Sequence, residues 1–177
     1  MKKSFFIFAL LLSMVLTSCS GDKENLTIFD NAVVVLPSGE ELSLYMNRES
    51  VEDILGSEPE QGALPGVLDY KDVSVGFTDG KLTFVDFVSD DSKTKTGIKL
   101  GDSSSALNEE DFIFHNEKIA GLYFSQNNEE LSLMDGPDKT AELFDMIYVN
   151  IIIDENGTIS TINISDANVA RTLKLDK

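Results

Sequence analysis

One segment near the C-terminus carries oxygen ligands at spacings that could bind calcium. Residues 154–160 read D-E-N-G-T-I-S, which is similar to the middle of an EF-hand loop, where carboxylate and amide oxygens surround the ion. When the segment is aligned on Gly157, the first and twelfth ligand positions fall on Ile152 and Asn163, where the loop needs Asp and Glu. The flanking residues have the composition of strands. We therefore interpret 154–160 as a hairpin turn.

Three acidic clusters are interpreted as solvated surface, with weak calcium binding by one of them as the open alternative. They are Asp90-Asp91, Glu109-Glu110-Asp111 and Glu129-Glu130. No metal ligand is assigned from them, because acidic runs in a chain of this charge are ordinary surface features.

The segment 92–97 reads S-K-T-K-T-G and contains both S-x-x-K and K-T-G, two signatures of penicillin-recognising enzymes. In those enzymes one motif lies on a helix and the other on a distant strand, and the fold brings them together. Here both motifs share Lys95, so they cannot face each other across a site, and S-D-N is absent. We interpret 92–97 as a polar loop that leads into a strand.

His115 is the single histidine, and it lies in the run D-F-I-F-H-N. One histidine does not build a typical zinc site, and no serine and acid partners for a catalytic triad can be located. The sequence has no G-x-S-x-G, H-E-x-x-H, phosphate-binding or dinucleotide-binding motif. We therefore predict no catalytic residue, no cofactor and no metal. Carboxylate pairs for glycoside chemistry stay open, because the fold sets their spacing.

Cys19, the single cysteine, ends the run Leu16-Thr17-Ser18-Cys19. This run follows Lys2-Lys3 and an apolar segment over 5–16 that is too short to span a bilayer. It resembles the lipobox of bacterial lipoproteins, which implies cleavage before Cys19 and attachment of a diacylglycerol, whose two chains anchor stably. We predict a signal peptide over 1–18 and a lipidated tether over 19–25. The alternative is an ordinary secretory signal that leaves a free thiol.

The composition limits the classes of partner. The formal net charge is −17, and loss of residues 1–18 removes two lysines and leaves 12 basic against 31 acidic side chains. Such acidity argues against nucleic acid and against binding to anionic lipid by charge. With one cysteine the chain forms no intrachain disulfide, so its core alone must stabilise the fold.

Alternating and helical patterns predict the elements. Asn47 is a good N-cap, and Val51, Ile54 and Leu55 form one apolar stripe, so the sequence predicts a helix over 48–55 that ends at Gly56. Predicted strands cover 26–29, 32–36, 41–46, 70–77, 82–88, 98–100 and 119–124, with a further run over 130–134 and a hairpin over 152–166. Asp79-Gly80 and Asn156-Gly157 are typical of type I′ hairpin turns.

The chain repeats itself. Residues 42–51 align with 98–107 without a gap, and residues 77–90 align with 152–166 with one extra residue at the turn. The second helix is predicted to be weaker, because it contains three serines. We expect a first unit over 26–97 and a second over 98–177, each an α+β unit of one helix and an antiparallel sheet.

The pattern I-x-L-x-x-S/N-x-x-x-V, followed by V-x-V-x-F-x-D-G-K-L-x-x-V, covers about 41–166. It resembles lipoproteins with the β-lactamase inhibitory protein-like (BLIP-like) fold and the small outer-membrane assembly lipoproteins. The resemblance implies an α+β fold of two tandem units and a binding scaffold. It carries over no inhibitory residue.

These observations favour a lipid-anchored extracytoplasmic binding module for a protein or peptide partner, held at the cell membrane through Cys19. An outer membrane is the alternative location if the organism has one. The alternative functions are a structural or assembly lipoprotein of an envelope complex and, more remotely, an unrecognised hydrolase.

Overall fold

The computed structural model describes residues 26–56, 58–127, 130–136 and 146–173. Strand makes up 45% of the structure and helix 16%. The prediction of an α+β fold built from two helix-plus-antiparallel-sheet, BLIP-like units is therefore wrong: the protein is predominantly antiparallel β-sheet. None of the helices in the described ranges has the length and apolarity to cross a membrane.

The main sheet is antiparallel throughout. Its strands run in the order β10–β9–β11–β12–β6–β5–β4–β3, and β8 also pairs with β9. They are β3 (Glu60–Gln61), β4 (Val67–Asp69), β5 (Val73–Thr78), β6 (Lys81–Phe87), β8 (Ile113–Asn116), β9 (Ile119–Asn127), β10 (Glu130–Leu133), β11 (Met146–Ile153) and β12 (Ile159–Asp166). The pairing of β12 with β6 joins the hairpin β5–β6 to the hairpin β11–β12, so both halves of the chain share one sheet.

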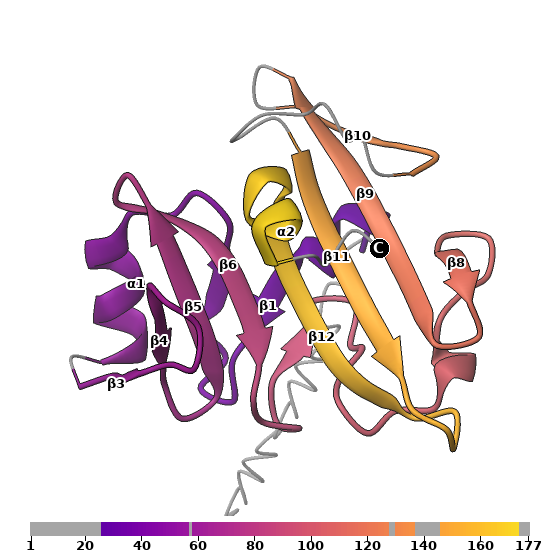
Figure 1. The fold of residues 1–177 in the computed structure, drawn as a ribbon, viewed down its shortest axis with the longest axis horizontal. Helices are drawn as coiled ribbons and strands as arrows, with labels where there is room; N and C mark the ends of the chain where they lie inside the picture. Colours follow the sequence, from indigo (N-terminus) through magenta and orange to yellow (C-terminus); the bar gives the residue numbers. More distant parts are fainter. Residues whose placement is uncertain (1–25, 57, 128–129, 137–145, 174–177) are drawn as a thin grey trace, which may run out of the picture.

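A second layer covers one face of this sheet. It contains the small sheet β2–β1–β7, the 3₁₀-helix η1 and the helix α1. The bounds are η1 (Ile28–Ala32), β1 (Val33–Val35), β2 (Glu41–Ser43), α1 (Arg48–Leu55) and β7 (Lys93–Thr94). Alternate residues of β11, such as Val149 and Ile151, are fully buried in the core between the layers. Figure 1 shows η1 and β1 behind the main sheet.

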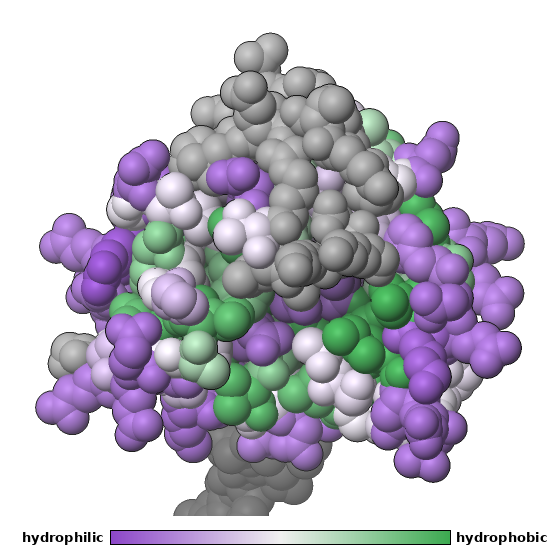
Figure 2. Space-filling model, viewed as in Figure 1, coloured by the Kyte–Doolittle hydropathy of each residue, from purple (hydrophilic) through white to green (hydrophobic). Residues whose placement is uncertain are grey.

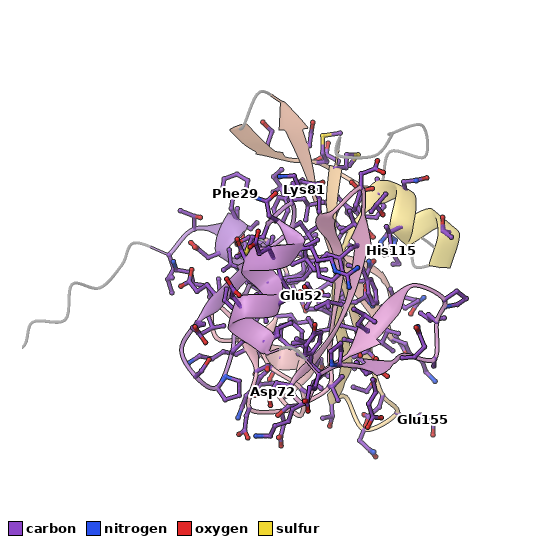
Figure 3. The ribbon with its side chains drawn as sticks, turned by 90° about the vertical axis from the view of Figure 1, so that its left-hand side faces the viewer. Phe29, Glu52, Asp72, Lys81, His115 and Glu155 are labelled. Carbon is purple, nitrogen blue, oxygen red and sulfur yellow. The ribbon has the colours of Figure 1, made fainter. Side chains whose placement is uncertain are left out.

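The opposite face of the main sheet carries the C-terminal helix α2 (Ala167–Leu173), which Figure 1 shows in front of the strands. Ala167 and Ala170 are fully buried against Tyr123 and Tyr148. We call this side of the sheet the α2 face. The view in Figure 3 places Phe29, which packs on the core, and His115 on opposite sides of the sheet. The sequence patterns did not predict α2.

The internal repeat recurs in the backbone hydrogen bonds. In the first half, Tyr45 N–H donates to Leu82 O over 2.7 Å; in the second, Gly101 N–H donates to Ile159 O over 2.9 Å. Tyr45 and Gly101 both have positive φ, 71° and 85°. The repeated feature is therefore a residue with positive φ whose backbone N–H donates to the strand that follows a hairpin turn.

The helices that follow these crossings differ. The first half has α1 over the predicted range, whereas the second has only the three-residue 3₁₀-helix η2 (Ser104–Ala106). The Ser103 side chain accepts a hydrogen bond from Ser105 N–H as an N-cap, which starts η2. Serine is a weaker helix former than the residues of α1, and the two serines of η2 favour a single turn over the predicted helix.

Local turn and strand predictions have mixed outcomes. Asp79 and Gly80 both have positive φ, as a type I′ turn requires. In the second hairpin only Gly157 does, so a type I′ turn at Asn156-Gly157 is wrong. The predicted strand 26–29 is replaced by η1, and 98–100 makes only an isolated bridge at Lys99.

Candidate functional site

A row of polar residues crosses the α2 face. Direct cross-strand pairing places Asp69 of β4 beside Ser74 of β5, Ser74 beside Asp86 of β6, Asp86 beside Asn163 of β12, and Asn163 beside Asn150 of β11. We call these five residues the polar row. Side chains opposite each other in an antiparallel sheet share one face, so the row is continuous over five strands.

The row is buried. Asn150 and Asn163 are each only 3% exposed, and Ser74 is also buried. Ser74 Oγ donates to Asp69 Oδ1 over 2.6 Å, and Asn150 Nδ2 donates to Asn163 Oδ1 over 3.2 Å. These two hydrogen bonds join the residues at each end of the row, and Asp86 lies between the two pairs.

Three buried oxygens on this face have no hydrogen-bond partner in the structure. They are Asp86 Oδ1, Asn150 Oδ1 and Ser165 Oγ. Ser165 lies two residues from Asn163 on β12, so it projects from the same face. Buried polar atoms are paired in the great majority of cases, and an unpaired one calls for a partner outside the chain or a strained role. Three of them in neighbouring positions single out this part of the sheet.

Asp86 has the most perturbed carboxyl of the row. Burial raises its pKa from 3.8 to about 6; the backbone N–H of Phe87 opposes this shift, and the charge of Asp69 reinforces it. No side-chain cation of the described residues is paired with Asp86. No cation of the described residues therefore neutralises this carboxylate.

Exposed apolar side chains lie beside the row. Val88 is 53% exposed, and Ile152 is 39% exposed. Val88 directly follows β6, two residues past Asp86, and Ile152 shares a side with Asn150 by alternation on β11. Ile119 pairs directly with Ile152 and continues the stripe on β9. We call Val88, Ile152 and Ile119 the apolar rim. Figure 2 shows green side chains beside purple ones across this face.

Two tyrosines lie at the β11 end of the polar row, Tyr123 on β9 and Tyr148 on β11. Tyr123 and Tyr148 meet edge to face with ring centroids 5.0 Å apart, and Tyr123 Oη is hydrogen-bonded to His115 Nε2. Gly121, which pairs with Asn150, leaves room for this arrangement: a Cβ on it would lie 2.6 Å from Tyr123 Oη. Glycine is thus required here by a close approach.

A hollow of about 220 Å³ opens between α2 and the strands β4 to β6. Its walls include Gly76 and Phe84 of the sheet and Asn168, Val169 and Thr172 of α2. Phe84 lies two residues from Asp86 on the same side of β6, so the hollow borders the polar row.

The segments that the sequence singled out lie elsewhere and are structural. The prediction of a polar loop over 92–97 is wrong in part, because Lys93–Thr94 forms strand β7 of the small sheet and Ser92 and Thr94 are fully buried. Lys95 pairs with Glu41 over 3.2 Å. Asp154 Oδ1 accepts backbone N–H groups of Asn156 and Thr158, which lowers the pKa of this carboxyl and closes the β11–β12 hairpin. The interpretation of 154–160 as a turn is confirmed.

No group of three or more His, Cys, Asp or Glu side chains in the described part of the chain is placed to hold a metal ion. His115 is exposed and contacts Tyr123 rather than a serine or an acid. Cys19, the segments 1–18 and 19–25, and Glu129 of the third acidic cluster lie outside the described residues.

Sequence reasoning did not predict the polar row, although polar residues that interrupt apolar runs are a signal for it. Asn150 interrupts the apolar run of β11, and Asp86 interrupts the apolar run F-V-D-F of β6. A lone polar side chain in such a run indicates a polar position on a buried face. Which strands lie side by side depends on the pairing of β12 with β6, which no local pattern specifies.

Comparison with known proteins gives no relative: no family model, no curated protein and no solved structure matches the chain. The resemblance to BLIP-like lipoproteins stays a prediction.

Proposed function

We propose that this protein is a lipid-anchored extracytoplasmic binding module whose binding surface is the α2 face of the main sheet. The observation that carries the proposal is the cluster of three unpartnered buried oxygens beside an exposed apolar rim. Apolar area drives association, and acceptor oxygens without donors give the adjoining surface a negative potential that favours a cationic group on the partner. The lipid anchor is proposed because residues 16–19 resemble a lipobox that ends at Cys19.

A protein or peptide suits this face better than a small apolar ligand. The rim and the polar row extend across neighbouring strands, so the surface is broad rather than a closed cavity. Interfaces between proteins combine an apolar patch with polar groups in this way. A structural lipoprotein of an envelope complex would use the same face, held by a permanent partner.

We propose binding rather than catalysis, because the described residues assemble no nucleophile with a general base. Ser92 is buried beside the small sheet, and His115 is hydrogen-bonded to Tyr123. A hydrolase is the competing class, and turnover of a substrate panel by the purified protein would favour it.

The test is affinity capture from envelope and secreted fractions, with residues 20–177 as bait at two salt concentrations. Ile152→Glu places a charge in the rim. Leu133→Glu is the matched control, because Leu133 is 47% exposed and pairs with the core residue Phe124, which assigns it to the other face. We expect a partner that wild type and Leu133→Glu retain and Ile152→Glu loses. Equal retention by all three baits would overturn the proposal.

A further inference from the structure

We propose that Asp86 and its neighbours in the polar row receive a primary ammonium group, the lysine side chain of a partner protein. The inference rests on the proposed function and adds the chemistry of the ligand. Asp86 is an anion, and none of the described residues supplies a cation that pairs with it.

The surroundings of Asp86 favour a cation. Asn150 Nδ2 donates a hydrogen bond to Asn163 Oδ1, whereas Asn150 Oδ1 is an acceptor without a donor. Asp86 Oδ1 is a second acceptor without a donor. Asp69 adds a further negative charge beside Ser74. Carboxylate and amide oxygens without donors create a negative potential in a region shielded from water, where charges interact strongly. With a net charge of −17, the chain also repels anionic partners.

The apolar rim fits the stem of a lysine. A lysine side chain lays its four methylene groups along apolar surface and keeps its ammonium at a polar site. Ile152 lies two residues from Asn150 on the same side of β11, and Val88 directly follows β6, two residues past Asp86. A stem that crosses Ile152 therefore ends at the row.

The geometry favours lysine over arginine. A guanidinium binds carboxylate through two parallel hydrogen bonds, which requires both carboxylate oxygens. Asp86 Oδ1 is sealed from solvent, so a ligand from outside approaches the carboxylate from one side. An ammonium is a compact point charge and needs only one accessible oxygen.

The test uses n-butylammonium, which reproduces the lysine side chain, and n-butanol, which has the same stem without the charge. The readouts are the ¹³C shift of the Asp86 carboxyl and the side-chain amide signals of Asn150 and Asn163. We compare wild type with Asp86→Asn and with Asp53→Asn, which removes an exposed acid on α1. Ethylguanidinium is a further probe.

We expect saturable shifts with n-butylammonium in wild type and Asp53→Asn, and an affinity lower by about tenfold or more in Asp86→Asn. Ethylguanidinium should bind less tightly than n-butylammonium, and n-butanol should leave the Asp86 carboxyl unchanged. Equal binding to Asp86→Asn, no saturable shift, or an equal response to n-butanol would overturn the inference. A captured partner that Ile152→Glu loses would still support the α2 face, so the two proposals fail separately.

Discussion

Asp86 and Asn163 lie directly opposite each other on β6 and β12, the two strands at which the two hairpins of the chain join into one sheet. Both are polar, and both face the side of the sheet that carries α2. The junction between the halves of the chain is therefore also the centre of the polar row. A sheet that only needed stability would place apolar side chains at such a junction, since these contribute free energy without leaving unpaired oxygens.

Replacing Asp86 by asparagine should raise stability at neutral pH. The folded-state pKa is raised from 3.8 to about 6, so the unfolded chain ionises first and folding loses stability as the pH rises from about 4 through 6. The stability gain of Asp86→Asn should grow over this interval by up to about 3 kcal/mol. Urea unfolding between pH 4 and 8 measures it. Asp53→Asn is the control, and a gain that does not change with pH would contradict the account.

Gly121→Ala should destabilise the protein more than Gly76→Ala does. A Cβ at Gly121 would lie 2.6 Å from Tyr123 Oη, whereas one at Gly76 would lie 3.2 Å from Phe84 Cβ. The first change must displace Tyr123 from His115 and Tyr148, at a cost of about 1–3 kcal/mol. Thermal unfolding and the near-ultraviolet circular dichroism of the tyrosines report both effects. Equal costs at the two positions would show that Tyr123 moves freely.

Tyr45→Phe should lower the free energy of unfolding by about 1.5–3 kcal/mol, because the Tyr45 hydroxyl lies 3.1 Å from the fully buried carboxylate oxygen Asp166 Oδ2. Tyr70→Phe is the matched change. The Tyr70 hydroxyl is buried without a partner, so its removal should leave stability equal or slightly higher. Chemical unfolding of both variants decides this, and the reverse order would disprove the assigned hydrogen bonds.

Cys19→Ala should abolish incorporation of a fatty acid label and release the protein from the membrane fraction. The physical reason is that two acyl chains anchor stably, whereas a protein without them keeps no comparable attachment. Metabolic labelling followed by membrane fractionation tests this. Equal labelling of the variant would end the lipoprotein assignment.

Local patterns predicted much of the secondary structure but not its assembly. The helix over 48–55 follows from its N-cap and its apolar stripe, and most strands follow from alternation. The 3₁₀-helix η2 was expected to be a weak helix, and its serines explain why it stays one turn long. The helix α2 escaped prediction because two small alanines, rather than a long apolar stripe, make its packing contacts.

The candidate site could not be assembled from sequence, because its members become neighbours only through long-range strand pairing. Asp86 and Asn163 lie in different halves of the repeat, and the prediction of two separate units kept them apart. A repeat in sequence indicates similar local structure, whereas the pairing of edge strands decides whether two units form two sheets or one.

Methyl NMR with the captured partner tests whether the α2 face is the binding surface. The captured partner is added to protein with labelled Val, Ile and Leu methyl groups. We predict that signals of Val88, Ile119 and Ile152 shift or broaden, while Leu133 on the other face keeps its signal. Shifts confined to Leu133 or to α1, with the rim unchanged, would contradict the account and place the binding surface elsewhere.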